Sequence, residues 1–501
     1  MKHYHTKKLI SLILAALMLG GAFVGCANEE TTEQTDETEA PNAAAETDAP
    51  EETEKKYLDN LPESMNYDGT EIRFVTAIEK ISIEVTDDDI TGDILTDAYW
   101  KRNEALASRM NVKPVVSEKV GYGGIIPAVT QSVTAASDDY DIISGCASAT
   151  LSLATSHYVV NLDKTGYTEY IDVSQPYWSE KMVSNINYKD NLYWLAGDMT
   201  HSIIQETYAM FVNATVWNNY HAEKSVYDLV FDGKWTLDTM AQYAEGANQD
   251  NNGDGVYDKN DSYGVIMQQG HILNGIIASS DVQYTAVDSE GAYSVALNNE
   301  HTIDAFTKLH NIFTKSEYGF MMYGAEYDSE AISMFTTNRA MFVPYTFSLI
   351  TYAPVREMES DFYVIPLPKY DENQKDYRVI HYDGISIYGV PTTVPMEKKE
   401  MIASTLEAMC SMTSQMVMPT YYDVVLKNKY SRDRTTADMI DLIHDSLTAD
   451  FCFYWGNDLG GLMNIFYDNI MNESITSRLK ASEKVWDRMM DKLVASLTQT
   501  E

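Results

Sequence analysis

The chain has 501 residues, 45% of them hydrophobic, and its 75 acidic residues outnumber its 36 basic residues to give a net charge of −39. Such a negative charge argues against binding to nucleic acid or to anionic lipid, because both present phosphates. About 445 residues follow residue 56. This length exceeds what one hydrophobic core usually organises, and it predicts two lobes.

The N-terminus has the layout of an export signal. Three lysines precede an apolar run over residues 9–24, which ends at a glycine and Cys26. The run is too short to span a membrane comfortably. We expect residues 1–25 to be a lipoprotein signal peptide and Cys26 to become the lipidated (palmitate-bearing) first residue, on the outer face of the cell membrane. The alternative is an ordinary secretory signal with a coincidental cysteine.

The next segment, residues 26–56, is expected to be a disordered acidic linker. From residue 27 onward it holds eleven carboxylates and no aromatic or branched aliphatic residue. Such a composition cannot bury enough apolar surface to fold, and its charges repel one another. We interpret the segment as a spacer between the membrane and a folded body that begins near Tyr57.

Along that body, apolar runs alternate with amphipathic stretches, a pattern typical of an α/β fold with largely parallel sheets. We expect strands at residues 72–76, 113–116 and 140–145, and helices at residues 93–110 and 474–497. The remaining cysteines, Cys146, Cys410 and Cys452, are widely spaced and odd in number. This predicts buried thiols, with one disulfide bond as the alternative.

Residues 250–261 follow the pattern of a calcium-binding loop. Oxygen side chains recur at alternate positions around Gly255, where the chain must turn, and residues 262–266 are expected to form a strand. Ca²⁺ prefers 6–8 oxygen ligands. The expected ligands are Asp250, Asn252, Asp254, the carbonyl of Val256, Asp258 and Asp261. Asp261 stands where an EF-hand has Glu, so we expect a structural Ca²⁺ and no sensor role; the alternative is a surface turn without metal.

Five segments in a fixed order carry a family resemblance: residues 98–104, 139–145, 227–237, 335–342 and 361–368. In the third, a strand-like stretch over residues 227–230 precedes a turn at Gly233 and a helix that begins at Thr236. In the fourth, Asn338 replaces the usual glycine. Together the segments resemble the extracellular solute-binding lipoproteins of ATP-driven (ABC) importers, in the branch that includes many sugar binders.

The resemblance implies a two-lobed, periplasmic-binding-protein-like (type II) α/β fold with hinge-crossing strands. Lobe 1 would comprise residues 65–167 and 384–435, and lobe 2 residues 168–383 and 436–500. The resemblance further implies a monomer that closes on a small polar ligand and delivers it to membrane permease subunits. A hinge crossing is expected at Tyr382-Asp383-Gly384, because glycine can absorb backbone rotation.

A sugar site needs flat aromatic faces beside carboxylates and amides. We expect Trp455 to be the best stacking residue, although each aromatic residue could also be core. The full set of expected ligand residues is Ser144, Gly145, Trp178, Asp198, Tyr345, Asp383, Trp455 and Asn457.

Enzyme motifs are missing from the sequence: there is no G-x-S-x-G, no G-x-x-x-x-G-K-[ST] and no H-E-x-x-H. We therefore expect a binding protein without catalytic activity. Three alternatives remain: a surface sensor of the same fold, a surface glycosidase, and a binder of peptides or other polar solutes.

Overall fold

The computed structural model describes residues 56–77, 92–323, 327–422, 434–472 and 474–499. These residues belong to one compact unit, Lys55–Glu501. The expected signal peptide, Cys26 and the linker up to residue 55 lie outside the described residues. Within the described part, no helix is both long and apolar enough to cross a membrane.

The first of two main sheets has the strand order β11-β3-β1-β2. Its strands are β1 (Thr70–Ala77), β2 (Val112–Val120), β3 (Ile142–Cys146) and β11 (Ser386–Gly389). The strand β1 pairs in parallel with β2 and β3, and β11 runs antiparallel to β3. The three strands predicted before residue 150 are confirmed.

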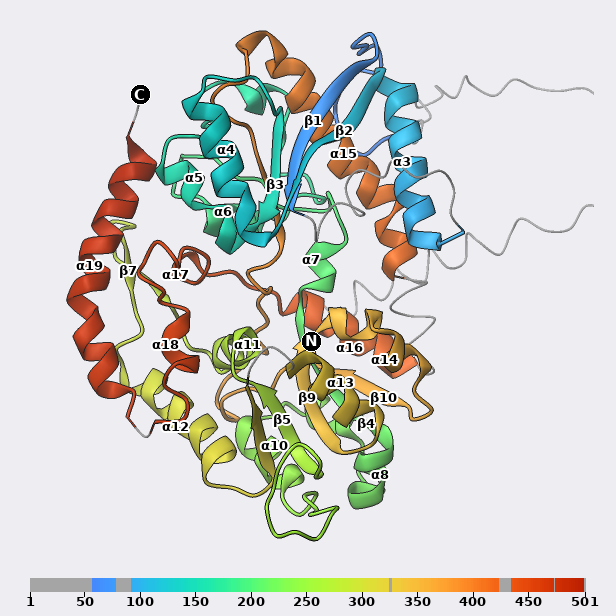
Figure 1. The fold of residues 1–501 in the computed structure, drawn as a ribbon, viewed down its shortest axis with the longest axis vertical. Helices are drawn as coiled ribbons and strands as arrows, with labels where there is room; N and C mark the ends of the chain where they lie inside the picture. Colours follow the sequence, from blue (N-terminus) through green and yellow to red (C-terminus); the bar gives the residue numbers. More distant parts are fainter. Residues whose placement is uncertain (1–55, 78–91, 324–326, 423–433, 473, 500–501) are drawn as a thin grey trace, which may run out of the picture. The chain divides into compact units, whose positions relative to one another are not determined.

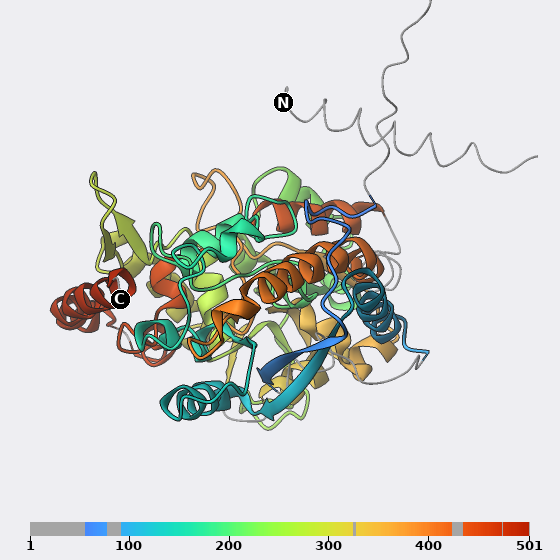
Figure 2. The same ribbon diagram turned by 90° about the horizontal axis from the view of Figure 1, so that it is seen from above.

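Helices α3 (Ile94–Met110) and α15 (Lys399–Met416) pack against each other beside this sheet and lie side by side in Figures 1 and 2. The predicted helix over residues 93–110 is confirmed. Asp93 caps it by accepting hydrogen bonds from the amides of Leu95 and Thr96. Asn111, in the left-handed conformation with φ 51°, ends it.

The second sheet has the strand order β10-β4-β9-β5-β8. Its strands are β4 (Tyr208–Asn213), β5 (Tyr263–Gln268), β8 (Gly319–Met322), β9 (Ala340–Thr346) and β10 (Phe362–Ile365). The strand β5 is parallel to β8 and β9, whereas β4 is antiparallel to both β9 and β10. The sheet is therefore mixed, so the expectation of largely parallel sheets holds only for the first one.

Helices surround the second sheet, and a small two-stranded sheet lies apart from it, beside the C-terminal helix (Figure 1). The helices are α8 (Ala214–His221), α9 (Val226–Phe231), α10 (Leu237–Ala244), α11 (His271–Ser279), α12 (Glu300–Thr314), α13 (Tyr327–Thr336), α14 (Ala353–Glu357) and α16 (Arg434–Asp445). The small sheet pairs β6 (Thr285–Val287) with β7 (Tyr293–Val295).

The stretch over residues 227–230 is helical, so its prediction as a strand is wrong. It lies in α9, whose first turn is capped by the Ser225 hydroxyl accepting from the amide of Asp228. The neighbouring predictions are confirmed: Gly233 turns with φ 70°, and Thr236 caps α10 by accepting from the amide of Thr239.

Two adjacent chain segments connect the sheets. The first runs through α7 (Ser202–Gln205) into β4, and the second returns from β10 to β11; they pair at Thr207 and His381. Before the first crossing lie α4 (Ile125–Thr134), α5 (Ser152–Thr155) and α6 (Glu180–Ile186). Leu195 pairs with Tyr388 of β11, so this stretch lies against the first sheet. We therefore propose that lobe 1 extends to about Asp198, beyond the expected boundary at residue 167.

The C-terminal segment forms α17 (Phe451–Tyr454), α18 (Asn464–Tyr467) and α19 (Thr476–Thr498). The predicted last helix is confirmed. Its apolar stripe, which includes Leu479, Trp486 and Leu493, is buried, and the helix packs against α5 and β7. Cys146, Cys410 and Cys452 are buried and form no disulfide bond, as the sequence predicts.

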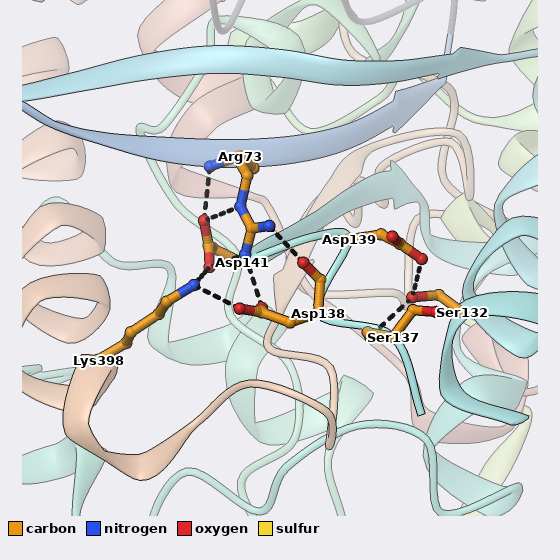
Figure 3. A network of polar contacts seen from close by, with 7 residues as sticks. All are labelled: Arg73, Ser132, Ser137, Asp138, Asp139, Asp141 and Lys398. Carbon is orange, nitrogen blue, oxygen red and sulfur yellow. Dashed lines mark hydrogen bonds and ion pairs between the residues drawn. The ribbon is translucent and has the colours of Figure 1, made fainter. Parts of the chain in front are cut away.

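A polar network secures the first sheet (Figure 3). Arg73 of β1 donates to both carboxylate oxygens of Asp141, at 2.8 and 2.9 Å, and Lys398, just before α15, donates to the same carboxylate at 3.1 Å. Burial alone would raise the pKa of Asp141, but these hydrogen bonds outweigh it and hold the pKa below its usual value. The network thereby ties β1, β3 and α15 together.

Candidate functional site

The carboxyl ends of strands from both sheets meet at the crossing segments, where open α/β sheets bind their ligands. After β3, the amide of Ala147 donates to Ile385 ahead of β11 at 3.0 Å. The amide of Tyr382 donates to Glu206 at 2.7 Å, and the amide of Phe347, after β9, donates to Thr207 at 3.0 Å. We refer to the surface formed here as the interlobe site.

Aromatic rings gather at this site from four segments. The ring of Tyr382 lies 4.3 Å from that of His271 and 6.4 Å from that of Tyr208, measured between ring centroids. The Tyr208 hydroxyl donates to the His271 carbonyl at 2.9 Å. Tyr327, which begins α13, lies 6.4 Å from His271. Burial lowers the pKa of His271 to about 4, so its ring is neutral at neutral pH.

Two carboxyl groups accompany the rings. Asp383 is buried, and burial raises its pKa to about 6 against the opposing hydrogen bond from Ser148. Burial also raises the pKa of Asp328, which accepts a hydrogen bond from the Tyr345 hydroxyl. Among the described residues, no lysine, arginine or histidine acts on the pKa of either carboxyl group. The interlobe site is therefore acidic and rich in hydrogen-bond acceptors.

Polar groups from the turns after β2 and β3, and from the segment after α17, complete the site. The hydroxyls of Tyr122 and Ser148 lie 2.6 Å apart, and the Asn457 amide donates to the Ser148 carbonyl at 2.8 Å. Tyr122 keeps 42% of its surface exposed. Aromatic faces, carboxylates and amides in this arrangement can hold a polyhydroxylated molecule.

Comparisons with known proteins identify the fold. No protein-family model matches the chain, and no curated protein does. Solved structures do match. An ABC substrate-binding protein from Listeria monocytogenes, in complex with cycloalternan, is 13% identical with a TM-score of 0.53; the match covers 85% of this chain and 100% of that one. The chain has the two-lobed fold of solute-binding proteins.

Two further solved structures agree in fold. A cyclo/maltodextrin-binding protein with maltotetraose is 12% identical, with a TM-score of 0.55 and coverage of 86% of this chain and 98% of that one. UgpB from Mycobacterium tuberculosis, with glycerophosphocholine, is 14% identical, with a TM-score of 0.54 and coverage of 79% and 95%. At these identities the likeness concerns the fold.

Within the solute-binding fold, the expected ligand residues separate into several places. Asp383 and Asn457 meet at Ser148, and Tyr345 binds Asp328 on the other side of the interlobe site. Trp178 and Asp198 instead line a pocket of about 510 Å³ elsewhere.

Three of the expected ligand residues are buried among core residues in this structure, which leaves their contact with a ligand untested. Trp455 has no exposed surface and packs 5.9 Å from Phe451. Ser144 and Gly145 are buried inside β3. A side chain at Gly145 would come within 2.3 Å of the Thr150 hydroxyl, so this glycine serves close packing.

Sequence reasoning missed His271, Tyr208, Asp328 and Tyr122. His271 follows β5 and Tyr122 follows β2, so the residues just beyond the predicted strands were the available signal. Tyr208 and Asp328 carried no such signal, because Tyr208 begins a strand and Asp328 lies in the first turn of a helix.

The expected calcium loop lies on the surface between α10 and β5. Asp250 accepts from the amides of Gly253 and Gly255, at 2.7 and 2.8 Å, and Asp261 accepts from Asn251 and Asp258. Among the described residues, no group of three or more His, Cys, Asp or Glu side chains is placed to hold a metal ion. Calcium binding therefore stays a prediction.

Proposed function

We propose that the protein captures a carbohydrate, such as an oligosaccharide, in the interlobe site and delivers it to an ABC permease. The observation that carries the proposal is the cluster of Tyr382, His271 and Tyr208 beside the buried carboxyl of Asp383. Aromatic rings suit the apolar faces of a sugar, and carboxylates accept from its hydroxyls.

The neighbouring structures support this choice. Two of them hold the oligosaccharides cycloalternan and maltotetraose. A third holds glycerophosphocholine, which carries a phosphate. An anionic group of that kind fits poorly beside Asp383 and Asp328, because neither carboxyl group has a cationic partner among the described residues. A neutral sugar fits better.

Binding would draw the two lobes together about the crossing segments at Thr207 and His381. The permease would recognise this closed form, and the protein itself would neither form nor cleave a covalent bond in its ligand. Lipidation of Cys26 would hold a monomer on the outer face of the cell membrane, within reach of the permease.

We further propose that residues 250–261 bind a structural Ca²⁺. Asp250, Asn252, Asp254, Asp258 and Asp261 supply oxygen ligands within one short loop, and the Val256 carbonyl supplies another. The two glycines with φ of 73° and 78° allow the loop to fold back on itself.

A melting-shift screen with neutral oligosaccharides, peptides and polyols tests the function. We expect a concentration-dependent rise in Tm with at least one neutral oligosaccharide, because a ligand that binds only the folded state stabilises it. A shift with peptides alone would overturn the carbohydrate assignment. Turnover of the sugar would instead indicate a glycosidase.

A further inference from the structure

A pocket of about 510 Å³ lies at the crossing segments, apart from the interlobe site. Its volume falls within the range of small-molecule sites, about 300–1,000 Å³. Both crossing segments contribute to its lining, with Asp198, Ile203 and Ile204 from the first and His381 from the second. Ser414, Met418, Pro419, His444 and Leu447 also line it.

The pocket and the interlobe site lie on opposite sides of the crossing strands. His381 and Tyr382 are neighbours in an extended segment, whose successive side chains point in opposite directions. His381 lines the pocket, whereas the ring of Tyr382 contacts His271 in the interlobe site. A molecule in the pocket would therefore lie behind the hinge.

The pocket walls are mainly apolar. Trp178, Met182, Ile204, Met418 and Leu447 contribute to them. Trp178 is held in place because its indole nitrogen donates to the buried carboxylate of Glu407 at 2.8 Å. Such walls favour a compact molecule with an apolar body.

One acidic group stands inside these walls. Asp198 is half-buried in the pocket wall, and a side-chain hydrogen bond with Ser414 opposes the rise in its pKa that burial causes. A carboxylate has about four acceptor positions, so most of its capacity is left for another donor. His381 cannot supply a cation, because burial lowers its pKa to about 3. Lys181 is exposed and donates to the Leu447 carbonyl at 2.6 Å.

We propose that this hinge pocket is a second ligand site, which takes a small organic amine with its apolar body against Trp178 and its ammonium group on Asp198. A half-buried carboxylate gains most from a partner that brings both charge and hydrogen-bond donors. Part of the lining belongs to the crossing segments, about which the lobes close under the proposed function. Occupancy would therefore shift the affinity of the interlobe site, and the shift would be reciprocal.

Calorimetric titration with phenethylamine tests the proposal without any sugar, so its outcome is independent of the proposed function. We expect saturable binding with a Kd on the order of 1 mM, and binding at least about tenfold weaker for the uncharged analogue 2-phenylethanol. Equal binding of both compounds, or no saturation with the amine at about 20 mM, would overturn the proposal.

Substitutions locate the site. D198N should weaken phenethylamine binding about tenfold or more, whereas E180Q, which removes one carboxylate at the exposed rim, should change it less than about twofold. I204W, which fills the pocket, should abolish binding of the amine. If D198N behaves like E180Q, or if I204W still binds, the proposed site is refuted.

The pH dependence provides a check without a substitution. Burial raises the pKa of Asp198 to about 6, with the Ser414 hydroxyl opposing the shift, so amine binding should weaken between about pH 7.5 and about pH 5 as the carboxylate gains a proton. The other titratable groups around it are Tyr177, Cys410, His381, Glu180, Lys181, Tyr422 and His444, and Glu407, whose pKa burial raises to about 7, lies behind Trp178. The same weakening in D198N would assign the effect to one of these groups and overturn the role of Asp198.

Discussion

Replacing Asp383 by asparagine should stabilise the protein at neutral pH. The buried Asp383 has a pKa of about 6, against 3.8 for an unperturbed aspartate. A raised pKa means that the protonated form suits the folded state. The stability that the protonated Asp383 gives the folded state is fully present below pH 3.8 and is lost as the pH rises through about 6. A difference of about 2 pKa units corresponds to about 3 kcal/mol, to order of magnitude.

The asparagine side chain would keep the shape of the aspartate without its charge. An entropy of unfolding of about 0.9 kcal/mol/K for this chain length converts about 3 kcal/mol into a Tm increase of about 3 °C. Differential scanning fluorimetry at about pH 7.5 should show this increase, and at about pH 4, where Asp383 is already protonated in the folded state, the increase should vanish.

The matched control is Asp232→Asn, because Asp232 is exposed and pairs with exposed Lys234 at 3.1 Å. Such a surface pair contributes about 0–1 kcal/mol to stability, so the Tm of the D232N variant should stay nearly unchanged at both pH values. A lower Tm for D383N at about pH 7.5, or an equal increase at both pH values, would refute the electrostatic interpretation of Asp383.

Three further substitutions or treatments probe the fold and the metal. D141N weakens the pairing with Arg73 and should lower the free energy of unfolding by about 3 kcal/mol in urea titrations near neutral pH. The loss should shrink below pH 3.8, because Asp141, whose pKa is lowered in the folded state, becomes protonated there. A loss under about 0.5 kcal/mol near neutral pH would contradict this expectation. W455F should lower Tm but leave ligand affinity unchanged, because Trp455 is core; a weakened affinity at constant fold would restore its stacking role. EDTA should lower Tm and Ca²⁺ restore it, with D250N insensitive to both; indifference of the unaltered protein would exclude the calcium loop.

The sequence could predict elements whose signals are local. The first strands follow from short apolar runs, and α3 follows from Asp93 at its start and Asn111 at its end. The prediction for residues 227–230 failed because so short a run, with three apolar residues in four, suits a strand or a helix equally. In the structure, the Ser225 side chain caps the first turn of α9 and thereby favours the helix.

From the sequence, the candidate site could be predicted only at the expected hinge crossing, where a glycine follows Tyr382 and Asp383. Gly384 pointed to Asp383, and the structure supplies a further reason for that glycine: a side chain there would come within 2.5 Å of the Tyr382 ring. The residues next to Trp455 in the sequence resemble those of a ligand-binding loop, and only the burial of its side chain shows that it is a core residue. Tyr208 and His271 meet through strand pairing across distant segments, which no local pattern encodes.

Calorimetric titration of the Y382A variant with the oligosaccharide found in the screen tests the central claim most directly. W455F provides the control, since both substitutions remove aromatic volume but only Tyr382 lies in the interlobe site. Loss of the Tyr382 ring should weaken binding at least about tenfold, while W455F should bind like the unaltered protein. Unchanged affinity in Y382A, with the fold intact, would contradict carbohydrate capture at the interlobe site.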